Sequence, residues 1–130
     1  DSYGNLIDQY NADVRNYIDM PGSYWDAIHT GMRQVVEDKS YYKNLAVNVA
    51  GKTGTAQESA NRPNHSLFVC YAPYEAPEIA VATRIAYGYT SSYAAQVTKE
   101  VLSYYFELRD EDDILSGTAH SLQDGATNAD

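Results

Sequence analysis

The chain has 130 residues and a hydrophobic fraction of 44%, which fits one modest globular domain. Its net charge is −9, but residues 107–130 hold seven acidic residues and one basic residue, so the rest of the chain carries only −3. This balance, with no basic cluster, argues against a nucleic-acid partner. The single cysteine, Cys70, allows no internal disulfide bond, and no apolar stretch is long enough to span a membrane.

Pro21-Gly22 predicts a turn, and we expect a helix over residues 23–38 with Ser23 as its N-cap. The apolar side chains of this segment recur at helical spacing, which predicts one stripe that faces the core. The stripe consists of Trp25, Ile28, Met32, Val35 and Val36. His29 lies off the stripe and is expected to be exposed to solvent.

Three segments are expected to be β-strands, at residues 45–57, 66–72 and 79–87. The middle segment is apolar on both faces, which indicates a central or covered strand. In the last segment, larger side chains alternate with mostly small ones. One face carries Ile79, Val81, Thr83, Ile85 and Tyr87, and the other carries Ala80, Ala82, Arg84 and Ala86. The small residues predict a helix packed closely against the second face.

A last helix is expected over residues 91–106, capped by Ser91 or Ser92. Its apolar stripe comprises Ala94, Ala95, Thr98, Val101, Leu102 and Tyr105. The acidic, weakly patterned residues 107–130 are expected to be a disordered tail. The order is helix, three strands, helix, and the short connections favour an antiparallel meander in an α+β fold with flanking helices 23–38 and 91–106.

The most unusual stretch is Gly51-Lys52-Thr53-Gly54-Thr55-Ala56-Gln57, at the end of the first expected strand. Glycines in a strand often mark a place where a ligand comes close to the backbone. One ammonium and two hydroxyl groups along such bare backbone could hold a carboxylate. A phosphate-binding P-loop also ends in Gly-Lys-Thr, but its leading glycine would fall on Ala46, and the glycine-rich turn is missing.

The longer string, residues 50–57, resembles the K-T-G box of penicillin-binding proteins and serine β-lactamases, in the form usual in class B penicillin-binding proteins. Residues 25–36, 65–73 and 77–81 resemble the helix before the box and the two strands after it. The order of elements agrees as well, so the resemblance covers roughly residues 5 to 106. It implies the β-lactamase/transpeptidase-like fold. Residues 1–106 would then form the C-terminal portion of a transpeptidase domain.

The resemblance also implies an activity for the intact protein, which is serine acyl transfer on a stem peptide that ends in D-Ala-D-Ala, with β-lactams as mimics. Lys52 and Thr55 would be catalytic, with Lys52 in the proton network and the Thr55 N–H in the oxyanion hole. Thr53, Gly54 and Thr55 would bind substrate. Neither a cofactor nor a metal is implied. Lysine on an edge strand and threonine within a strand also have purely structural uses.

The family takes its nucleophile from an S-x-x-K motif and a second serine from S-x-N, and both precede the box. Ser40-Tyr41-Tyr42-Lys43 and Ser59-Ala60-Asn61 match these patterns formally. We reject both, because Ser40 has no room to begin a long helix and Ser59 follows the box. This chain alone is therefore expected to be inactive. Gln57, Glu58 and Arg62, which follow the box, are interpreted as surface loop residues.

Three further expectations follow from the resemblance. The protein would work at the extracytoplasmic face of a bacterial membrane, anchored by an N-terminal segment outside this chain. The chain would need the missing N-terminal part of its domain as partner, and alone it would self-associate through exposed strand edges. The alternatives are a serine β-lactamase or β-lactam sensor of the same superfamily, or a non-catalytic interaction domain that keeps the fold.

Overall fold

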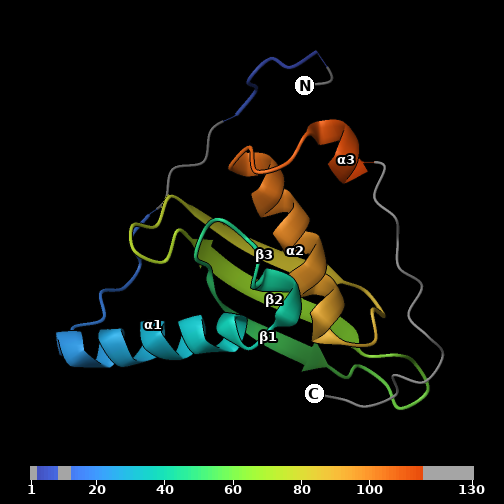
Figure 1. Ribbon diagram of the computed structural model, residues 1–130. Helices are drawn as coiled ribbons and strands as arrows, with labels where there is room; N and C mark the ends of the chain where they lie inside the picture. Colours follow the sequence, from blue (N-terminus) through green and yellow to red (C-terminus); the bar gives the residue numbers. More distant parts are fainter. Residues whose placement is uncertain (1–2, 9–12, 116–130) are drawn as a thin grey trace.

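A computed structural model describes residues 3–8 and 13–115 of the chain. Three strands, β1 (Ala50–Ala56), β2 (His65–Ala72) and β3 (Ile79–Ile85), form one antiparallel sheet in the order β1-β2-β3 (Figure 1). The predicted meander is therefore confirmed, with β2 as its central strand.

Strand β1 is shorter than the sequence predicts, because residues 45–49 do not join the sheet. Their backbone groups find other partners. The carbonyl of Asn48 accepts from the Tyr74 N–H at 2.8 Å, and the carbonyl of Val49 accepts from Arg33 Nη1 at 3.1 Å. These bonds satisfy the backbone without a neighbouring strand, so the ladder begins only at Ala50.

The two faces of the sheet have different surroundings. Directly paired residues share a face, so Thr53, Phe68 and Thr83 point to one side, which we call the covered face. Helix α2 (Ser91–Tyr105) lies across this face (Figure 1), and the Thr83 and Thr98 hydroxyls are 2.7 Å apart. The opposite side, the open face, carries Lys52, Val69 and Ala82, which are all exposed.

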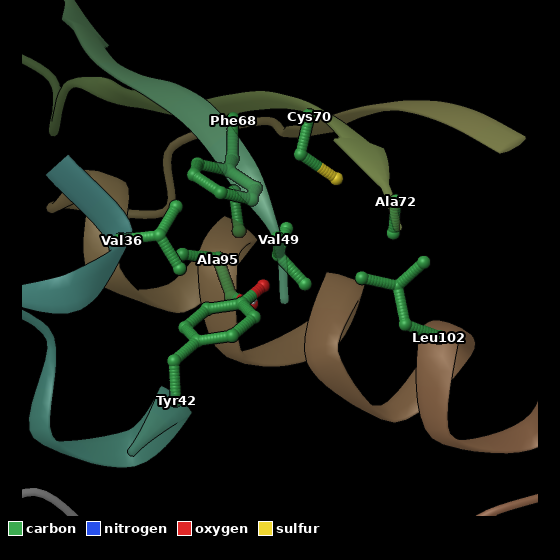
Figure 2. Close-up of a cluster of buried hydrophobic side chains, with 9 residues drawn as sticks. Val36, Tyr42, Val49, Phe68, Cys70, Ala72, Ala95 and Leu102 are labelled. Carbon is green, nitrogen blue, oxygen red and sulfur yellow. Dashed lines mark hydrogen bonds between the residues drawn. The ribbon is translucent and has the colours of Figure 1, made fainter. Parts of the chain in front are cut away.

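The hydrophobic core fills the space between the covered face and α2. Figure 2 shows its side chains converging from the sheet, from α2 and from the segment before β1. Its buried members are Val36, Tyr42, Val49, Phe68, Cys70, Ala72, Ala94, Ala95 and Leu102. Tyr42 lies in the short 3₁₀ helix η1 (Ser40–Tyr42), and its hydroxyl donates to the carbonyl of Ala95 at 2.8 Å.

The prediction that a helix packs on the alanine face of β3 is wrong. Ala80 and Ala82 lie exposed on the open face, whereas Val81 and its branched neighbours face α2. The small residues that allow close approach are on the helix itself, where Ala94 and Ala95 are completely buried. Large side chains on the strand therefore pack against small ones on the helix, and this arrangement fills the interface as completely as small residues on the strand would.

Helix α2 also differs in detail from its predicted form. Thr90, and not Ser91 or Ser92, is the N-cap, and its hydroxyl accepts from the Ser92 N–H at 3.4 Å. Ser91 is buried in the first turn. The core stripe includes Ala94, Ala95, Thr98 and Leu102 as expected, but Val101 and Tyr105 are exposed. Val101 lies at the margin of the stripe, and Tyr105 is the last residue of the helix.

Helix α1 (Gly22–Glu37) buries much less than the sequence predicts, since only Val36 of its stripe is buried. Trp25 and Ile28 are 38% and 46% exposed, because the helix lies beside β1 (Figure 1) and only its last turn enters the core. Its N-cap is Pro21, which has no side-chain acceptor, so the predicted Ser23 cap is wrong. His29 is exposed as expected, with its ring 5.6 Å from that of Tyr71.

The first part of the expected tail contains a short helix, α3 (Glu111–Leu115), with three acidic residues in its first turn that complement the helix dipole. Arg109 connects it to α2, donating to Glu100 Oε2 at 2.6 Å and to the Asp113 carbonyl at 3.0 Å. The expectation of disorder for residues 116–130 lies outside the described residues. Within the described part of the chain, no helix has both the length and the apolar character needed to cross a bilayer.

Candidate active site

The lysine box occupies β1, an edge strand of the sheet. Because successive side chains alternate between faces, Lys52 and Gly54 belong to the open face, and Thr53 and Thr55 belong to the covered face. The structure therefore brings the predicted site residues together along one strand but divides them between two sides. A ligand that contacts all of them must lie along the outer edge of β1.

The outer edge of β1 is available for such a contact. Among the residues that the structure describes, no strand pairs with it. In Figure 1, the arrowhead of β1 extends past the end of α1, so the second half of the box is not covered by that helix. An edge strand presents unpaired N–H and C=O groups, to which an extended peptide can add as a further strand.

The Lys52 side chain is exposed and lies close to the backbone. Its ammonium donates to the neighbouring carbonyl of Thr53 at 2.8 Å. Within the described residues, no hydrogen bond or ion pair joins Lys52 to a serine or a carboxylate. An ammonium has three donors, so two remain for a substrate or for groups supplied from elsewhere.

The two glycines of the box serve different purposes. A Cβ on Gly51 would lie 2.5 Å from Cζ of Phe68 and 2.9 Å from the Val69 carbonyl oxygen, so a side chain there collides with the core. A Cβ on Gly54 would meet only Leu67, at 3.3 Å from its Cβ. Gly51 is therefore required by packing, and Gly54 leaves the backbone bare on the open face.

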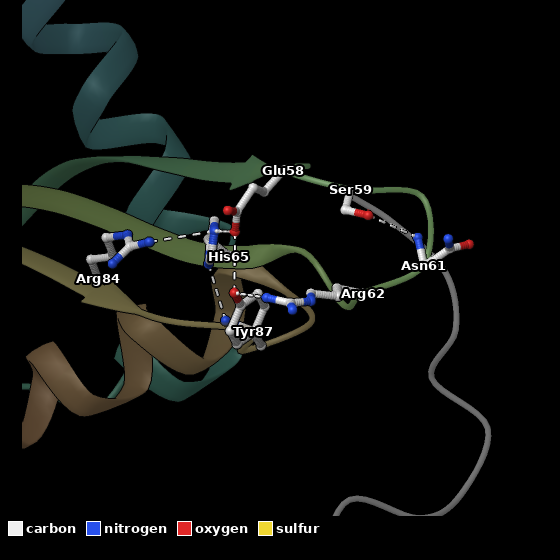
Figure 3. A network of polar contacts seen from close by, with 7 residues as sticks. All are labelled: Glu58, Ser59, Asn61, Arg62, His65, Arg84 and Tyr87. Carbon is white, nitrogen blue, oxygen red and sulfur yellow. Dashed lines mark hydrogen bonds and ion pairs between the residues drawn. The ribbon is translucent and has the colours of Figure 1, made fainter.

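Each of the two rejected serines lies in a short local turn. Ser40 begins the three-residue η1 turn, and its carbonyl accepts from the Lys43 N–H at 3.3 Å. Ser59 lies in the loop after β1, where its Oγ accepts from the Asn61 N–H at 3.3 Å (Figure 3). Both hold local turns. No described hydrogen bond connects either of them to Lys52.

Sequence reasoning missed a polar cluster at the end of the box strand, formed by Glu58, Arg62, His65 and Tyr87 (Figure 3). We call it the strand-end cluster. Glu58 Oε2 lies 3.0 Å from Nε2 of His65, and Arg62 Nη1 donates to the Tyr87 hydroxyl at 2.7 Å. The one signal in the sequence is that Glu58, Arg62 and His65 follow the box closely, and the structure then pairs His65 with Ala56 at the end of β1.

The strongly perturbed ionisable groups lie in the core and not at the box. Burial raises the pKa of the Cys70 thiol to about 11, although a hydrogen bond with the Val81 backbone partly offsets this. Burial also raises the pKa of the Tyr42 hydroxyl strongly. Both groups are neutral packing elements at physiological pH, so neither suggests acid–base chemistry.

Comparison with solved structures establishes the fold. The chain superposes on penicillin-binding protein 2 of Pseudomonas aeruginosa, in complex with WCK 5153, with a TM-score of 0.63 and 35% identity over 79% of this chain and 24% of that chain. It also superposes on penicillin-binding protein A of Mycobacterium tuberculosis, with a TM-score of 0.59 and 24% identity over 67% of this chain and 20% of that chain. The predicted β-lactamase/transpeptidase-like fold is confirmed.

Sequence comparison gives the family. The model of the penicillin binding protein transpeptidase domain matches residues 3–103, so the chain belongs to this family, as the resemblance over residues 5 to 106 predicted. It is 32% identical over 127 residues to penicillin-binding protein 2A of Bacillus subtilis and 28% identical over 134 residues to the peptidoglycan D,D-transpeptidase MrdA of Acinetobacter baumannii. These alignments cover 85% and 92% of this chain but only 18% and 19% of the relatives, so the chain spans less than a fifth of the length of each.

Proposed function

We propose that this chain is part of a peptidoglycan D,D-transpeptidase that cross-links cell-wall stem peptides and binds β-lactams. The observation that carries the proposal is the placement of Lys52, Thr53 and Thr55 along the outer edge of β1, with which no strand of the described residues pairs. Membership of the transpeptidase family supports it, as does the similarity to a relative named as a peptidoglycan D,D-transpeptidase.

The proposed reaction is acyl transfer through a serine that lies outside this chain. The serine oxygen attacks the carbonyl of the penultimate D-alanine, and the terminal D-alanine leaves. An amine from a second stem peptide then attacks the acyl-enzyme, forms the cross-link and releases the serine. A β-lactam enters the same path, but its cleaved amide stays attached through the ring, so the acyl-enzyme persists.

Each box residue has a proposed role along this edge. The two unused donors of Lys52 supply positive potential and join the proton network of the incoming serines. The Thr53 and Thr55 hydroxyls bind the substrate carboxylate, and the Thr55 N–H forms one half of the oxyanion hole, with the nucleophile's own N–H as the other. Gly54 leaves room for the substrate backbone to approach the strand.

Labelling with a fluorescent penicillin tests this proposal. The full-length protein should be acylated, whereas this chain alone should not be, because we propose that it carries no nucleophile. Lys52→Ala in the full-length protein should slow acylation by about a hundredfold or more, as expected when electrostatic stabilisation of the transition state is lost. Lys43→Ala, which removes another exposed lysine near the box strand in sequence, is the matched control and should leave labelling unchanged.

The outcome also separates the alternatives. A labelled adduct that turns over rapidly would indicate a β-lactamase, and a full-length protein that is never labelled would indicate a non-catalytic domain. Labelling of this chain at Ser40 or Ser59 would show that a real nucleophile had been rejected.

Two further parts of the proposal concern location and assembly. A stem-peptide substrate places the protein at the extracytoplasmic face of the membrane, which protease accessibility in intact spheroplasts can test. The isolated chain should self-associate through the outer edges of β1 and β3, which no other strand of the described residues pairs with, because unpaired strand edges pair with available partners. Light scattering over a range of concentrations measures this, and a monodisperse monomer at high concentration would contradict it.

A further inference from the structure

The strand-end cluster joins the ends of all three strands. Glu58 follows β1, His65 begins β2 and Tyr87 follows β3 (Figure 3). Glu58 Oε2 lies 3.0 Å from His65 Nε2 and accepts from the Tyr87 hydroxyl at 3.3 Å. The Tyr87 and His65 rings are 4.9 Å apart, and the Arg62 guanidinium lies 5.5 Å from the centre of the Tyr87 ring. The His65 side chain therefore contacts Glu58, which follows β1, and Tyr87, which follows β3.

The hydrogen bonds define one proton arrangement on His65. The Tyr87 backbone N–H can only donate, and it points to Nδ1 at 3.1 Å, so Nδ1 is an acceptor without a proton. In the neutral ring, Nε2 then carries the proton and donates to the Glu58 carboxylate. Arg84 Nη2 also lies 3.4 Å from Nε2. Because both nitrogens carry protons in this arrangement, the two groups are in packing contact and do not form a hydrogen bond.

The backbone around Tyr87 is held in an uncommon conformation. Tyr87 and Tyr89 have φ values of 56° and 67°, in the left-handed region that non-glycine residues seldom adopt. The Tyr89 N–H donates to the Asn64 carbonyl at 3.0 Å, and a Cβ on Gly88 would lie 2.8 Å from that of Ser66. Such strain persists only where the surroundings over-determine it, and here they fix the turn against the beginning of β2.

The beginning of β2 is the segment that supports the functional end of the box. His65 pairs with Ala56, and Ser66 pairs with Thr55. Ser66 is completely buried, and its Oγ accepts from the Ala94 N–H of α2 at 3.0 Å. The partner strand of Thr55 is thus fixed by α2 on one side and by the strand-end cluster on the other.

We propose that Glu58, His65 and Tyr87 are positioning residues for the acylation step. They fix the last residues of β1 so that the Thr55 N–H points to the developing oxyanion. This inference rests on the proposed function of the box. It assigns to the cluster no contact with substrate, so its loss should slow acylation without weakening the non-covalent binding that precedes it.

Glu58→Ala is the informative variant, because the Glu58 side chain is 57% exposed and its removal threatens the fold little. It removes the acceptor for His65 Nε2–H. Glu58→Gln restores an oxygen acceptor of the same size and should rescue the effect. Glu78→Ala, an exposed glutamate in the β2–β3 turn at the opposite end of the sheet, is the matched control.

The first measurement uses this chain and does not depend on catalysis. In amide NMR spectra, Glu58→Ala should shift the Thr55 and Ala56 resonances and leave that of Ala50, at the other end of β1, in place. The ¹⁵N shifts of His65 should report a protonated Nε2 in the wild type. Unchanged Thr55 and Ala56 resonances in Glu58→Ala would overturn the proposal.

The second measurement uses the full-length protein and penicillin acylation kinetics. Glu58→Ala should lower the limiting acylation rate about ten- to a hundredfold, with the dissociation constant of the non-covalent complex within about twofold of wild type. Wild-type rates in Glu58→Ala, or a change in the dissociation constant alone, would contradict positioning. A wild-type protein that is not acylated would refute the proposed function and, with it, the acylation role, while the spectra would still decide whether the cluster fixes β1.

Discussion

The two faces of the sheet differ more than their sequences suggest. Phe68 and Val69 are neighbours in the central strand and both are apolar, yet Phe68 is 1% exposed and Val69 is 47% exposed. The covered face has α2 and the core against it. Of the described residues, α1 lies against the open face at one end, where His29 meets Tyr71. Among the described residues, a helix and a hydrophobic core cover one face of the sheet, and the other face is largely exposed.

The two faces are therefore expected to affect different properties of the protein. The covered face accounts for most of the apolar burial and should determine whether the chain folds. The open face carries the exposed Lys52 beside Val69 and Ala82, so an apolar surface lies next to a cation there. We expect substitutions on the covered face to change stability strongly, and those on the open face to change association or activity instead.

The largest effect should come from comparing neighbours on β2. Phe68→Ala removes a fully buried ring and should lower the free energy of unfolding by about 3–5 kcal/mol. Val69→Ala, on the open face, should cost less than about 1 kcal/mol. Urea denaturation measures both. Equal losses would mean that the open face is also packed in solution.

A smaller effect should distinguish the two glycines of the box. Gly51→Ala places a methyl group against Phe68 and the Val69 carbonyl and should cost about 1–3 kcal/mol through overpacking. Gly54→Ala meets only the Leu67 side chain and should cost less. In thermal unfolding, the variant at residue 51 should therefore melt well below the variant at residue 54, and the reverse order would contradict the assignment of faces.

The Cys70 thiol provides a pH test of the covered face. Its folded pKa, about 11, lies above the ordinary thiol value of 9.0 because burial disfavours the thiolate. The resulting stability is fully present below pH 9 and is lost as pH rises toward 11, reaching a loss of about 1 kcal/mol at pH 10. Cys70→Ala should remove this component from the stability–pH profile. An unchanged profile would show that the thiol is accessible to water.

The smallest effect on stability is expected for Ala82→Lys on the open face. The side chain is exposed, so the free energy of unfolding should change by no more than about 0.5 kcal/mol. The added charge should nevertheless weaken self-association of the isolated chain, because charge on an exposed apolar sheet opposes pairing. Sedimentation at matched concentrations compares the variant with the wild type.

The sequence predicts the sheet well because its signals are local. Alternation along residues 79–87 and the short turns identify three antiparallel strands, and the period of two already divides Lys52 from Thr53 and Thr55. What alternation cannot show is which face a helix covers. Ala80 and Ala82 suggested close packing, but the small residues that α2 uses are its own.

The errors have related physical causes. The spacing of Trp25 and Ile28 shows that one face of α1 is apolar but not what that face meets, and the described residues leave it largely exposed. The strand-end cluster was missed because Tyr87 lies 22 residues after His65, and nothing in the sequence shows that it returns to Glu58 and His65. They meet only after the three strands pair, through a turn in which Tyr87 and Tyr89, and not Gly88 between them, have the left-handed conformation.

The hydrogen bond from Tyr42 to the carbonyl of Ala95 has a consequence for the order of folding. It joins residues 53 positions apart, whereas β2, β3 and α2 follow one another closely along the chain. Because closing a long loop costs entropy before any contact is gained, the strand pair and α2 should form the nucleus and the Tyr42 bond should form late. Tyr42→Phe should then speed unfolding and leave the refolding rate almost unchanged, which stopped-flow kinetics can measure. Slower refolding in this variant would place the first half of the chain in the nucleus instead.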